Sequence, residues 1–504
     1  MTEQTPASDN TDPQLLAAID LGSNSFHIVV AQLDQGELRT VDILSDKVQL
    51  AAGINEKRKL TDEAKQRGLD CLSRFAQRVK DLPQDAIRVV GTNALREAKN
   101  SKEFIEEAEA ILGVPIEIIA GREEARLIYL GVSHTQADDL GSRLVLDIGG
   151  GSTEFIIGER FEPRIMESLH MGCVSYTKRF FVDGTINQRN FNLAHTAALL
   201  ELQTIQYNYR DIGWKNAIGA SGTVKAIRNA CVSCGYSKDT ITRKALHQLR
   251  DRMLTFDHSD EINIDGIKSE RTKVLPAGVA ILCAIFEALQ LEDLSFSEGA
   301  LREGVLYDMA GRLRHEDVRD RTINAMMQRY HVDTGQAERV EQTALIAWAQ
   351  LKESWQLSQK HYDMLSWAAR THEVGLTIAH NQFHKHSAYL LTHSDLPGFT
   401  TREQLQLATL VRGHRRKFPK SEFKALPGRI QETYERLCVL LRLASVLHHS
   451  RSKDRLPAIT YRTKDQKLIM EFPENWLEHH PLTQADLEQE AGYLAQADIK
   501  LSFS

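Results

Sequence analysis

The chain has 504 residues, of which 42% are hydrophobic and 26% are charged, and its net charge at pH 7 is -6. A chain of this length is too long to fold around a single hydrophobic core, so we expect several domains. The negative net charge gives no general attraction for a polyanion, which argues against DNA as a partner. An anionic substrate would have to be held by local basic patches or backbone N–H groups.

The sequence also bears on location. Six cysteines are scattered along the chain, a distribution typical of free thiols in a reducing compartment, so we expect a cytoplasmic protein. Residues 1–13 are polar and lack the apolar segment of a secretory signal, which predicts a disordered lead-in. The longest apolar run, residues 274–286, is too short to span a bilayer and predicts a buried helix after Pro276. Peripheral attachment to the inner face of the cell membrane stays open.

An internal repeat appears when Asp20 is aligned with Asp147. In each copy an apolar strand ends in Asp, a turn rich in Gly, Ser and Asn follows, and a second β-rich run returns, as in a hairpin. Two copies predict two related lobes, each offering one phosphate-sized turn.

Local patterns around the repeat predict α/β architecture, because short strands alternate with helices. Strands are expected at residues 87–90, 116–119, 217–218 and 293–297, and helices at 61–79, 101–112 and 188–209. From about residue 312 strand signals fade and helical patterns continue to about residue 449. A final segment alternates like two paired strands, at 459–463 and 468–472, and ends in an acidic helix at 484–496.

Carboxylates at the strand ends are candidate metal ligands. Asp20 and Asp147 are placed where an oxygen ligand can hold Mg²⁺, and Glu154 follows on the returning strand of the second hairpin. Mg²⁺ usually takes only one or two protein carboxylates beside substrate phosphates. A strand-end Asp can also simply cap a turn, but the duplication favours the metal hypothesis.

Glycine-rich and hydroxyl-rich turns supply candidate phosphate-binding groups, because their backbone N–H groups are unobstructed. None of these turns follows the P-loop pattern, which excludes that kind of nucleotide site. The candidate residues are Ser23, Asn24, Gly149, Gly150, Gly151, Ser152, Ser221 and Gly222.

Two further positions are candidates for the reaction itself. Glu123 and Glu124 open a predicted helix, where one of them could orient and deprotonate a water molecule. On the residues alone, acidic side chains that simply suit a helix N-terminus are the favoured interpretation. Arg96 could bind phosphate through two donors, although a surface arginine is an equal alternative.

The predicted helical region contains a basic run at His414, Arg415, Arg416 and Lys417. It predicts either a solvated basic face or a track for a polyanion such as polyphosphate. His372-Glu-Val-Gly-Leu376 does not complete a His-Glu-x-x-His zinc motif, because Leu occupies the last position.

Five ordered motifs resemble those of the exopolyphosphatase and guanosine pentaphosphate phosphohydrolase family. They are Ile19-Asp-Leu-Gly-Ser-Asn-Ser-Phe-His27, Gly121-Arg-Glu-Glu-Ala-Arg-Leu-Ile128, Leu146-Asp-Ile-Gly-Gly-Gly-Ser-Thr-Glu154, Gly219-Ala-Ser-Gly-Thr223 and Gly299-Ala-Leu-Arg-Glu-Gly304.

The resemblance implies a fold and a site. It implies ribonuclease-H-like lobes of the actin, Hsp70 and sugar-kinase superfamily at 14–128 and 129–311, a helical HD-like domain at 312–452 and a small α+β module at 453–504. It implies Glu124 as general base, which reverses the interpretation made on the residues alone. It also implies Mg²⁺ at Asp147 and Glu154, phosphate binding by Arg96, and a homodimer.

The resemblance leaves the substrate to be chosen. Several stretches, among them the basic run at 410–417, look closer to long bacterial exopolyphosphatases, so we expect release of terminal orthophosphate from inorganic polyphosphate. The alternative is a guanosine pentaphosphate (pppGpp) 5′-phosphohydrolase that uses the same site and produces ppGpp. An ATP-dependent enzyme of the same superfamily and a non-enzymatic sensor of polyphosphate or alarmone are further alternatives.

Overall fold

A computed structural model describes residues 14–34, 37–136, 141–313, 317–464 and 467–504. The predicted lead-in at residues 1–13 lies outside them. The chain divides into two compact units, Met1–Glu316 and Asp317–Ser504, each of which is described by itself.

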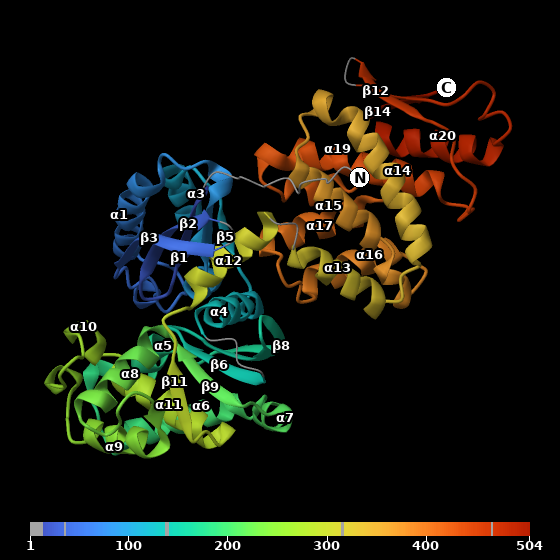
Figure 1. Ribbon diagram of the computed structural model, residues 1–504. Helices are drawn as coiled ribbons and strands as arrows, with labels where there is room; N and C mark the ends of the chain where they lie inside the picture. Colours follow the sequence, from blue (N-terminus) through green and yellow to red (C-terminus); the bar gives the residue numbers. More distant parts are fainter. Residues whose placement is uncertain (1–13, 35–36, 137–140, 314–316, 465–466) are drawn as a thin grey trace, which may run out of the picture. The chain divides into compact units, whose positions relative to one another are not determined.

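The first unit contains two mixed sheets of matching topology (Figure 1). The sheet of the first lobe has the order β3-β2-β1-β4-β5, and that of the second lobe has the order β10-β11-β9-β6-β7-β8. The first-lobe strands are β1 (Gln14–Leu21), β2 (Phe26–Asp34), β3 (Glu37–Asp46), β4 (Ile87–Gly91) and β5 (Ile116–Ile118). The second-lobe strands are β6 (Ser142–Ile148), β7 (Thr153–Glu159), β8 (Glu162–Leu169), β9 (Asn216–Ala220), β10 (Ile241–Thr242) and β11 (Asp293–Phe296).

The strand directions repeat as well as the order. The central strand of each sheet pairs antiparallel with the strand that follows it and parallel with the strand on its other side. Asp20 lies opposite His27, and Asp147 lies opposite Glu154. The repeat predicted from the sequence is therefore confirmed, strand by strand.

Helices surround these sheets. Those of the first lobe are α1 (Asp62–Val79), α2 (Asn93–Glu97), α3 (Ser101–Leu112) and α4 (Gly121–Thr135). Those that follow are α5 (Cys173–Phe180), α6 (Gln188–Leu202), α7 (Gln206–Ile212), α8 (Ser221–Ser233), α9 (Arg243–Met253), α10 (Ser269–Thr272), α11 (Leu275–Leu289) and α12 (Leu301–Leu313).

One predicted helix is divided in the structure. The pattern at 188–209 predicts a single helix, but α6 ends at Leu202 and α7 begins at Gln206. The hydroxyl and the amide of Thr204 both donate to the carbonyl of Glu201. A hydroxyl that binds a nearby carbonyl competes with the helical pattern and ends the helix.

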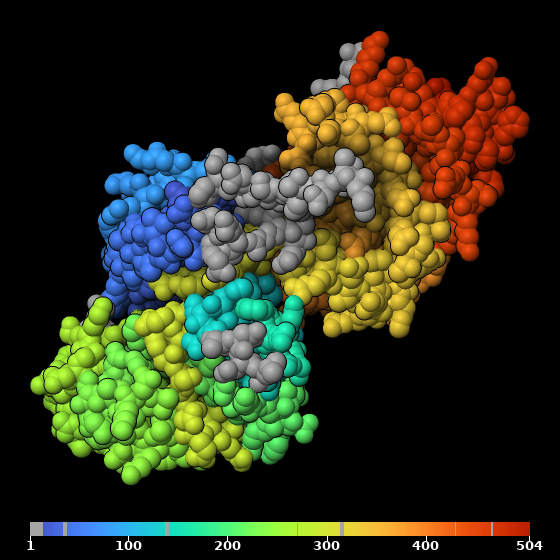
Figure 2. All heavy atoms as spheres, in the orientation of Figure 1, coloured from blue at the N-terminus to red at the C-terminus, as the bar shows by residue number. Residues whose placement is uncertain are grey.

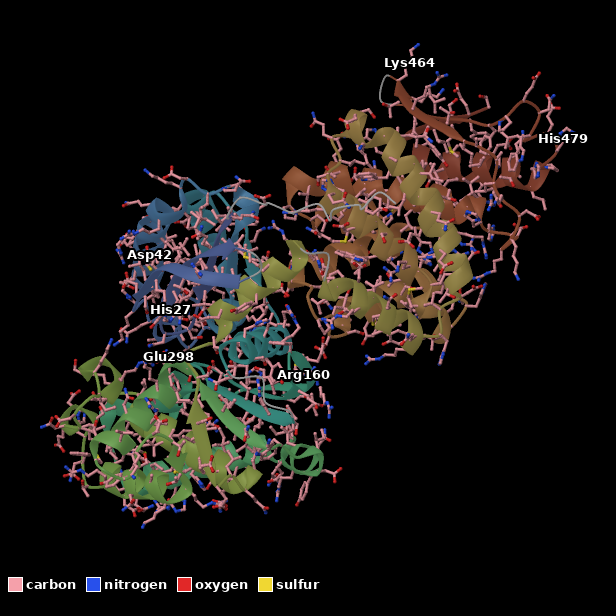
Figure 3. All side chains as sticks on the ribbon, in the orientation of Figure 1. His27, Asp42, Arg160, Glu298, Lys464 and His479 are labelled. Carbon is pink, nitrogen blue, oxygen red and sulfur yellow. The ribbon has the colours of Figure 1, made fainter. Side chains whose placement is uncertain are left out.

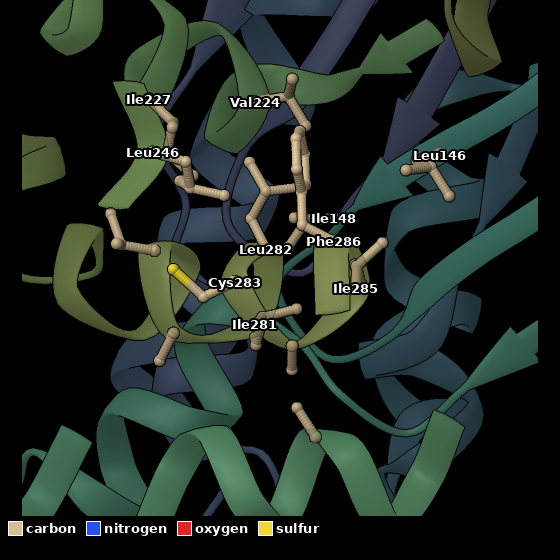
Figure 4. Close-up of a cluster of buried hydrophobic side chains, with 14 of the residues drawn as sticks. Leu146, Ile148, Val224, Ile227, Leu246, Ile281, Leu282, Cys283, Ile285 and Phe286 are labelled. Atoms are coloured by element: carbon tan, nitrogen blue, oxygen red, sulfur yellow. The ribbon is translucent and has the colours of Figure 1, made fainter. Parts of the chain in front are cut away.

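Helix α11 is the buried helix that the apolar run predicted. Every residue of it except Glu287 is buried, and Pro276 lies in its first turn, where a missing N–H costs nothing. Its side chains Leu282 and Phe286 pack among the apolar residues of β6, α8 and α9 (Figure 4). In the described part of the chain, no helix is both long and apolar enough to cross a membrane.

The helix pair α4 and α12 joins the two lobes (Figure 2). Its apolar residues share one buried cluster with side chains from both sheets. The domain boundary predicted at 128/129 falls inside α4, and it stays a prediction.

The second unit is mainly helical. Its helices are α13 (Val318–Arg329), α14 (Thr334–Trp355), α15 (Gln359–Thr371), α16 (Phe383–His393), α17 (Thr401–Gly413), α18 (Lys420–Lys424), α19 (Gly428–Leu447) and α20 (Pro481–Ala495). A small sheet has the order β12-β13-β14, formed by Thr460–Lys464, Lys467–Glu471 and Lys500–Phe503. Residues on both sides of the predicted 452/453 boundary share one hydrophobic core, so that boundary also stays a prediction.

Candidate active site

The two hairpin turns of the repeat face each other in the first unit. A Cβ added to Gly150 would lie 2.9 Å from the Cβ of Ser23, and one added to Gly151 would collide with the side chain of Asn93. Glycine at these positions therefore lets the turn of the second lobe approach the first lobe closely.

A pocket of about 280 Å³ lies between these turns. Both lobes line it, together with the N-terminal part of α4 and the segment that leads into α12. His27 of the first lobe and Glu298 of the second are two of its lining residues (Figure 3). Eleven of the predicted site residues line it: Asp20, Ser23, Asn24, Glu124, Asp147, Gly149, Gly150, Gly151, Ser152, Ser221 and Gly222.

Glu124 lies in the first turn of α4 and is buried. Its Oε2 accepts a hydrogen bond of 2.9 Å from Nη1 of Arg96, which also donates to the carbonyl of Ile119 at 2.7 Å. Arg96 is not among the lining residues of the pocket. In this structure its guanidinium orients Glu124, and its predicted contact with phosphate stays a prediction.

The other carboxylates are crowded in buried surroundings. Burial and the charge of Glu124 raise the pKa of Asp147 to about 7. Burial, then Glu124, and then Asp147 and Glu303 raise the pKa of Asp20 to about 8, against a lowering effect of Arg302. Burial, Glu124 and Asp147 raise the pKa of Glu154 well above its ordinary value. Each carboxylate disfavours ionisation of its neighbours.

Glu154 lies beside Asp147 on the adjacent strand and is not among the lining residues of the pocket. Only 1% of its surface is exposed, and Oγ of Ser168 donates a hydrogen bond of 2.8 Å to it. Because Glu154 and Asp147 are opposite each other on adjacent strands, their side chains lie on the same face of the sheet.

The donor set fits Mg²⁺ completed by other ligands. No group of three or more His, Cys, Asp or Glu residues in the described part of the chain could hold a metal alone. Mg²⁺ needs only one or two protein carboxylates when water and substrate phosphates supply the rest. Oδ1 of Asp20 is buried without a hydrogen-bond partner among the described residues, and a nearby cation would offset the crowding of negative charge.

The helix α8 begins at the third predicted turn. Ser221 has φ of +84°, a left-handed conformation that is uncommon outside glycine and accumulates at functional sites. A Cβ added to Gly222 would collide with the guanidinium of Arg271. Gly222 thus admits a cationic side chain to the wall of the pocket.

Residues 29–313 match the model of the Ppx/GppA phosphatase family, and residues 318–491 match that of the Ppx/GppA phosphatase domain III. The chain belongs to the Ppx/GppA phosphatase family. It is 43% identical over 487 residues to the guanosine-5′-triphosphate,3′-diphosphate pyrophosphatase of Vibrio campbellii, covering 96% of this chain and 97% of the relative. The protein of the same name from Vibrio cholerae serotype O1 is 44% identical with the same coverage.

Two solved structures are similar to the chain over a shorter extent. The Ppx/GppA family member from Aquifex aeolicus is 25% identical with a TM-score of 0.51, covering 60% of this chain and 99% of that one. An exopolyphosphatase from Cytophaga hutchinsonii is 24% identical with a TM-score of 0.55, covering 59% and 98%. At 24% identity, the comparison with the Cytophaga hutchinsonii protein shows similarity of fold and nothing about activity.

Several lining residues of this Ppx/GppA pocket were not predicted as site residues. They include three positive side chains, Lys225, Arg271 and Arg302, and His27, whose Nδ1 lies 3.3 Å from Nη1 of Arg302. Burial, Arg302 and Arg271 lower the pKa of His27 to about 3. The repeat alignment could have drawn attention to His27, because it corresponds to Glu154. Arg271 lies outside every motif and gave no comparable signal.

The predicted basic track lies in the second unit. His414 is buried, its Nδ1 lies 2.6 Å from the carbonyl oxygen of Val411, and its ring packs against His372. Arg415 is partly buried over the ring of Phe383. Arg416 and Lys417 are exposed. Any surface track at this place would use the three cationic residues rather than His414, and the track stays a prediction.

Proposed function

We propose that the chain hydrolyses the terminal phosphoryl group of the 5′-triphosphate of guanosine pentaphosphate, releasing orthophosphate and leaving ppGpp. The observation that carries this proposal is one pocket in which Glu124 and Asp147 face two glycine-rich or hydroxyl-rich turns from opposite lobes. The choice of nucleotide is supported by the pyrophosphatases that match over nearly the whole chain.

The nucleotide replaces inorganic polyphosphate as the main substrate. The sequence favoured polyphosphate because short stretches resembled long exopolyphosphatases, whereas relatives that align over 96% of the chain bear the name of the alternative activity. A likeness that extends along the whole chain outweighs a few short stretches. Exopolyphosphatase activity becomes the second candidate.

Glu124 is the proposed general base. It takes a proton from a water molecule, whose oxygen bonds to the terminal phosphorus while the bond from that phosphorus to the bridging oxygen breaks. Arg96 holds the carboxylate in position through the 2.9 Å hydrogen bond. The bridging oxygen stays with the departing diphosphate.

The turns are proposed to hold the phosphoryl oxygens with backbone N–H groups that are already positioned before reaction. Asp147, with Glu154 beside it on the adjacent strand and Asp20 from the opposite lobe, would hold Mg²⁺. When bound, Mg²⁺ neutralises charge on the phosphate oxygens. Arg302 and Arg271 add fixed positive charge to the wall.

Further assignments are proposals of the same kind. Residues 312–452 are assigned as an HD-like domain, residues 453–504 as a separate module, and the two lobes as ribonuclease-H-like. We also propose a homodimer located in the cytoplasm. The exposed cations Arg416 and Lys417 of the second unit would bind a longer anionic substrate.

The decisive experiment measures orthophosphate release from pppGpp and from long-chain polyphosphate, with Mg²⁺ and with Mg²⁺ removed by chelation. Wild type should favour pppGpp and require the metal. Glu124→Gln should lower kcat by about 10²–10⁴-fold, the usual contribution of a general base, while substrate still binds. Glu106→Gln, exposed on α3, is the matched control and should remain fully active.

Other outcomes would change the assignment. Faster release from polyphosphate would restore exopolyphosphatase as the main activity. Binding without release from either substrate would indicate a sensor, and full activity of Glu124→Gln would remove that residue as the base.

A further inference from the structure

Lys178 connects the two lobes beside the pocket. It extends from α5 of the second lobe, and its ammonium donates hydrogen bonds to the carbonyls of Ala51, Ala52 and Ile54 in the first lobe, at 2.8, 2.9 and 3.3 Å. Lys178 is not one of the described residues that line the pocket. Lys178 can therefore affect the reaction only through the groups that it holds in place.

On the second-lobe side, Lys178 is tied to a phosphate-binding turn. The amide of Cys173 donates to the carbonyl of Gly149 at 2.9 Å, and that of Val174 donates to Gly150 at 2.9 Å. A Cβ at Gly172 would collide with the backbone of Gly150. The first turn of α5 is therefore packed directly on the glycine-rich turn.

On the first-lobe side, the carbonyls bound by Lys178 belong to a segment that holds the opposite turn. The amide of Ala51 donates to the carbonyl of Ser23 at 2.9 Å, and the amide of Gln49 donates to that of Asn24 at 2.8 Å. A continuous series of hydrogen bonds thus runs from Gly149 and Gly150, through α5 and Lys178, to the turn at Ser23 and Asn24.

The chemistry of the contact requires an ammonium. Three carbonyls converge on one point, and a lysine ammonium has three donors and no acceptor. Within the described part of the chain, the hydrogen-bond partners of the Lys178 ammonium are these backbone carbonyls and not carboxylates. These carbonyls lie in and just after a 3-10 turn at Ala51–Gly53, and that of Ala51 also accepts a hydrogen bond of 3.2 Å from the amide of Ile54.

We propose that Lys178 is a positioning residue that sets the spacing between the two phosphate-binding turns. This inference rests on the proposed phosphohydrolase function. The turns would hold phosphate oxygens in the bound substrate and in the transition state. A change in the distance between the turns would therefore weaken binding of both, which raises KM and leaves kcat nearly unchanged.

The test is Lys178→Met in the full-length chain, with Mg²⁺ and pppGpp. KM should rise about tenfold or more while kcat changes by less than about threefold, since errors in the placement of binding groups of about 1 Å are costly. Binding of inorganic phosphate should weaken in parallel. Because Lys178 is exposed, the melting temperature should stay within about 2 °C of wild type, as for most surface substitutions.

The matched control is Arg179→Met. Arg179 is the next residue of α5, is also exposed, and lies over the ring of Phe180, with no hydrogen bond to the described residues of the first lobe. The Arg179→Met variant should have the KM of wild type. An equal rise in KM in both variants would indicate a general effect of surface charge and would overturn the proposal.

A rescue experiment separates the ammonium from the fold. Lys178→Cys treated with 2-bromoethylamine regains an ammonium at nearly the original length, and KM should return towards wild type. Treated wild type is the control, because Cys234 is the one native cysteine that is not buried. Failure to recover, or an unchanged KM in Lys178→Met, would overturn the proposal. Wild type that neither cleaves pppGpp nor binds phosphate would instead contradict the proposed function.

Discussion

The contact between Arg96 and Glu124 joins two residues that are 28 positions apart in sequence. Arg96 lies in the last turn of the short helix α2, and Glu124 lies in the first turn of α4, so the packing of these two helices decides where the carboxylate points. A general base must be aimed at its water molecule as well as suitably ionised. Arg96 can therefore act on the reaction without touching phosphate.

Replacing Arg96 by Met should lower kcat by about 10- to 100-fold and change KM by less than about threefold, because the loss is one of orientation at the reacting atoms. Steady-state kinetics with pppGpp measures both parameters. Arg39→Met, exposed on β3, is the control. A large rise in KM with unchanged kcat would contradict this role and support the phosphate contact predicted from sequence.

Asp308 is the centre of a buried ion network. It accepts hydrogen bonds from Arg88 at 2.6 Å, from Arg126 at 2.6 Å and from Arg312 at 2.9 Å. Burial alone would raise the pKa of Asp308, but these three guanidinium groups outweigh it and hold the pKa well below the ordinary value of 3.8. The network ties β4 to α4 and α12.

Asp308→Asn should lower the free energy of unfolding by about 3–5 kcal/mol at pH 7, because it leaves buried guanidinium groups without their carboxylate. The folded-state pKa lies below the unfolded value of 3.8, so this stabilisation is complete from about one pH unit above 3.8, begins to decline as pH falls through 3.8, and is lost only as pH falls through the lower folded-state pKa. Urea unfolding at pH 7, 5 and 4 measures the difference between variant and wild type.

The control for the ion network is Asp239→Asn, which removes an exposed carboxylate paired with Arg228. It should cost at most about 1 kcal/mol at any of these pH values. A similar cost for both variants, or a difference for Asp308→Asn that grows with acidity, would contradict the prediction.

At the scale of elements, the contact between α4 and α12 depends on glycine. A Cβ at Gly304 would collide with the carbonyl of Leu127, and one at Gly131 would collide with that of Ala300. The two helices touch through their backbones, and this close approach fixes the beginning of α4, where Glu124 lies. Packing that close leaves no room for even one methyl group.

Gly304→Ala should therefore destabilise the first unit by about 3 kcal/mol, the upper part of the usual range for overpacking. Gly492→Ala is the matched control, because Gly492 lies in α20 with nothing within 4 Å of an added Cβ. It should stabilise the second unit by about 0.4–1 kcal/mol through the unfolded state. Scanning calorimetry measures both changes in stability. A change of the same sign for the two substitutions would contradict the argument.

At the scale of the molecule, the chain consists of two units with separate hydrophobic cores. The Aquifex aeolicus family member aligns over 99% of its length with only 60% of this chain, and the matched family model ends at residue 313. A chain of about the size of the first unit is therefore sufficient to form the fold of the first unit.

The isolated unit Met1–Glu316 should fold and hydrolyse pppGpp with kcat within about tenfold of the full chain, because every described residue that lines the pocket lies in it. Circular dichroism and phosphate release test this directly. Activity on long polyphosphate should fall further than activity on pppGpp if the exposed cations of the second unit bind the polymer. Complete loss of pppGpp hydrolysis in a folded fragment would contradict it.

Local patterns in the sequence determined much of the fold. The helices at Asp62–Val79 and Ser101–Leu112 and the strands at Ile87–Gly91 and Asn216–Ala220 follow the predicted ranges closely. Periodicity and turn residues act over a few positions, so a sequence states them directly. The same locality explains why the hairpin turns of the repeat, and the acids beside them, could be named as candidates.

Only the tertiary structure decided which groups that are distant in sequence come together. Arg302 approaches His27 across 275 positions, Asp308 approaches Arg88 across 220, and Lys178 approaches Ala51 across 127. The strand Lys500–Phe503 likewise exists only through its pairing with Lys467–Glu471. Such contacts depend on how whole elements pack, and no local periodicity encodes them, so the sequence by itself determined the elements and their turns while packing determined the lining of the pocket.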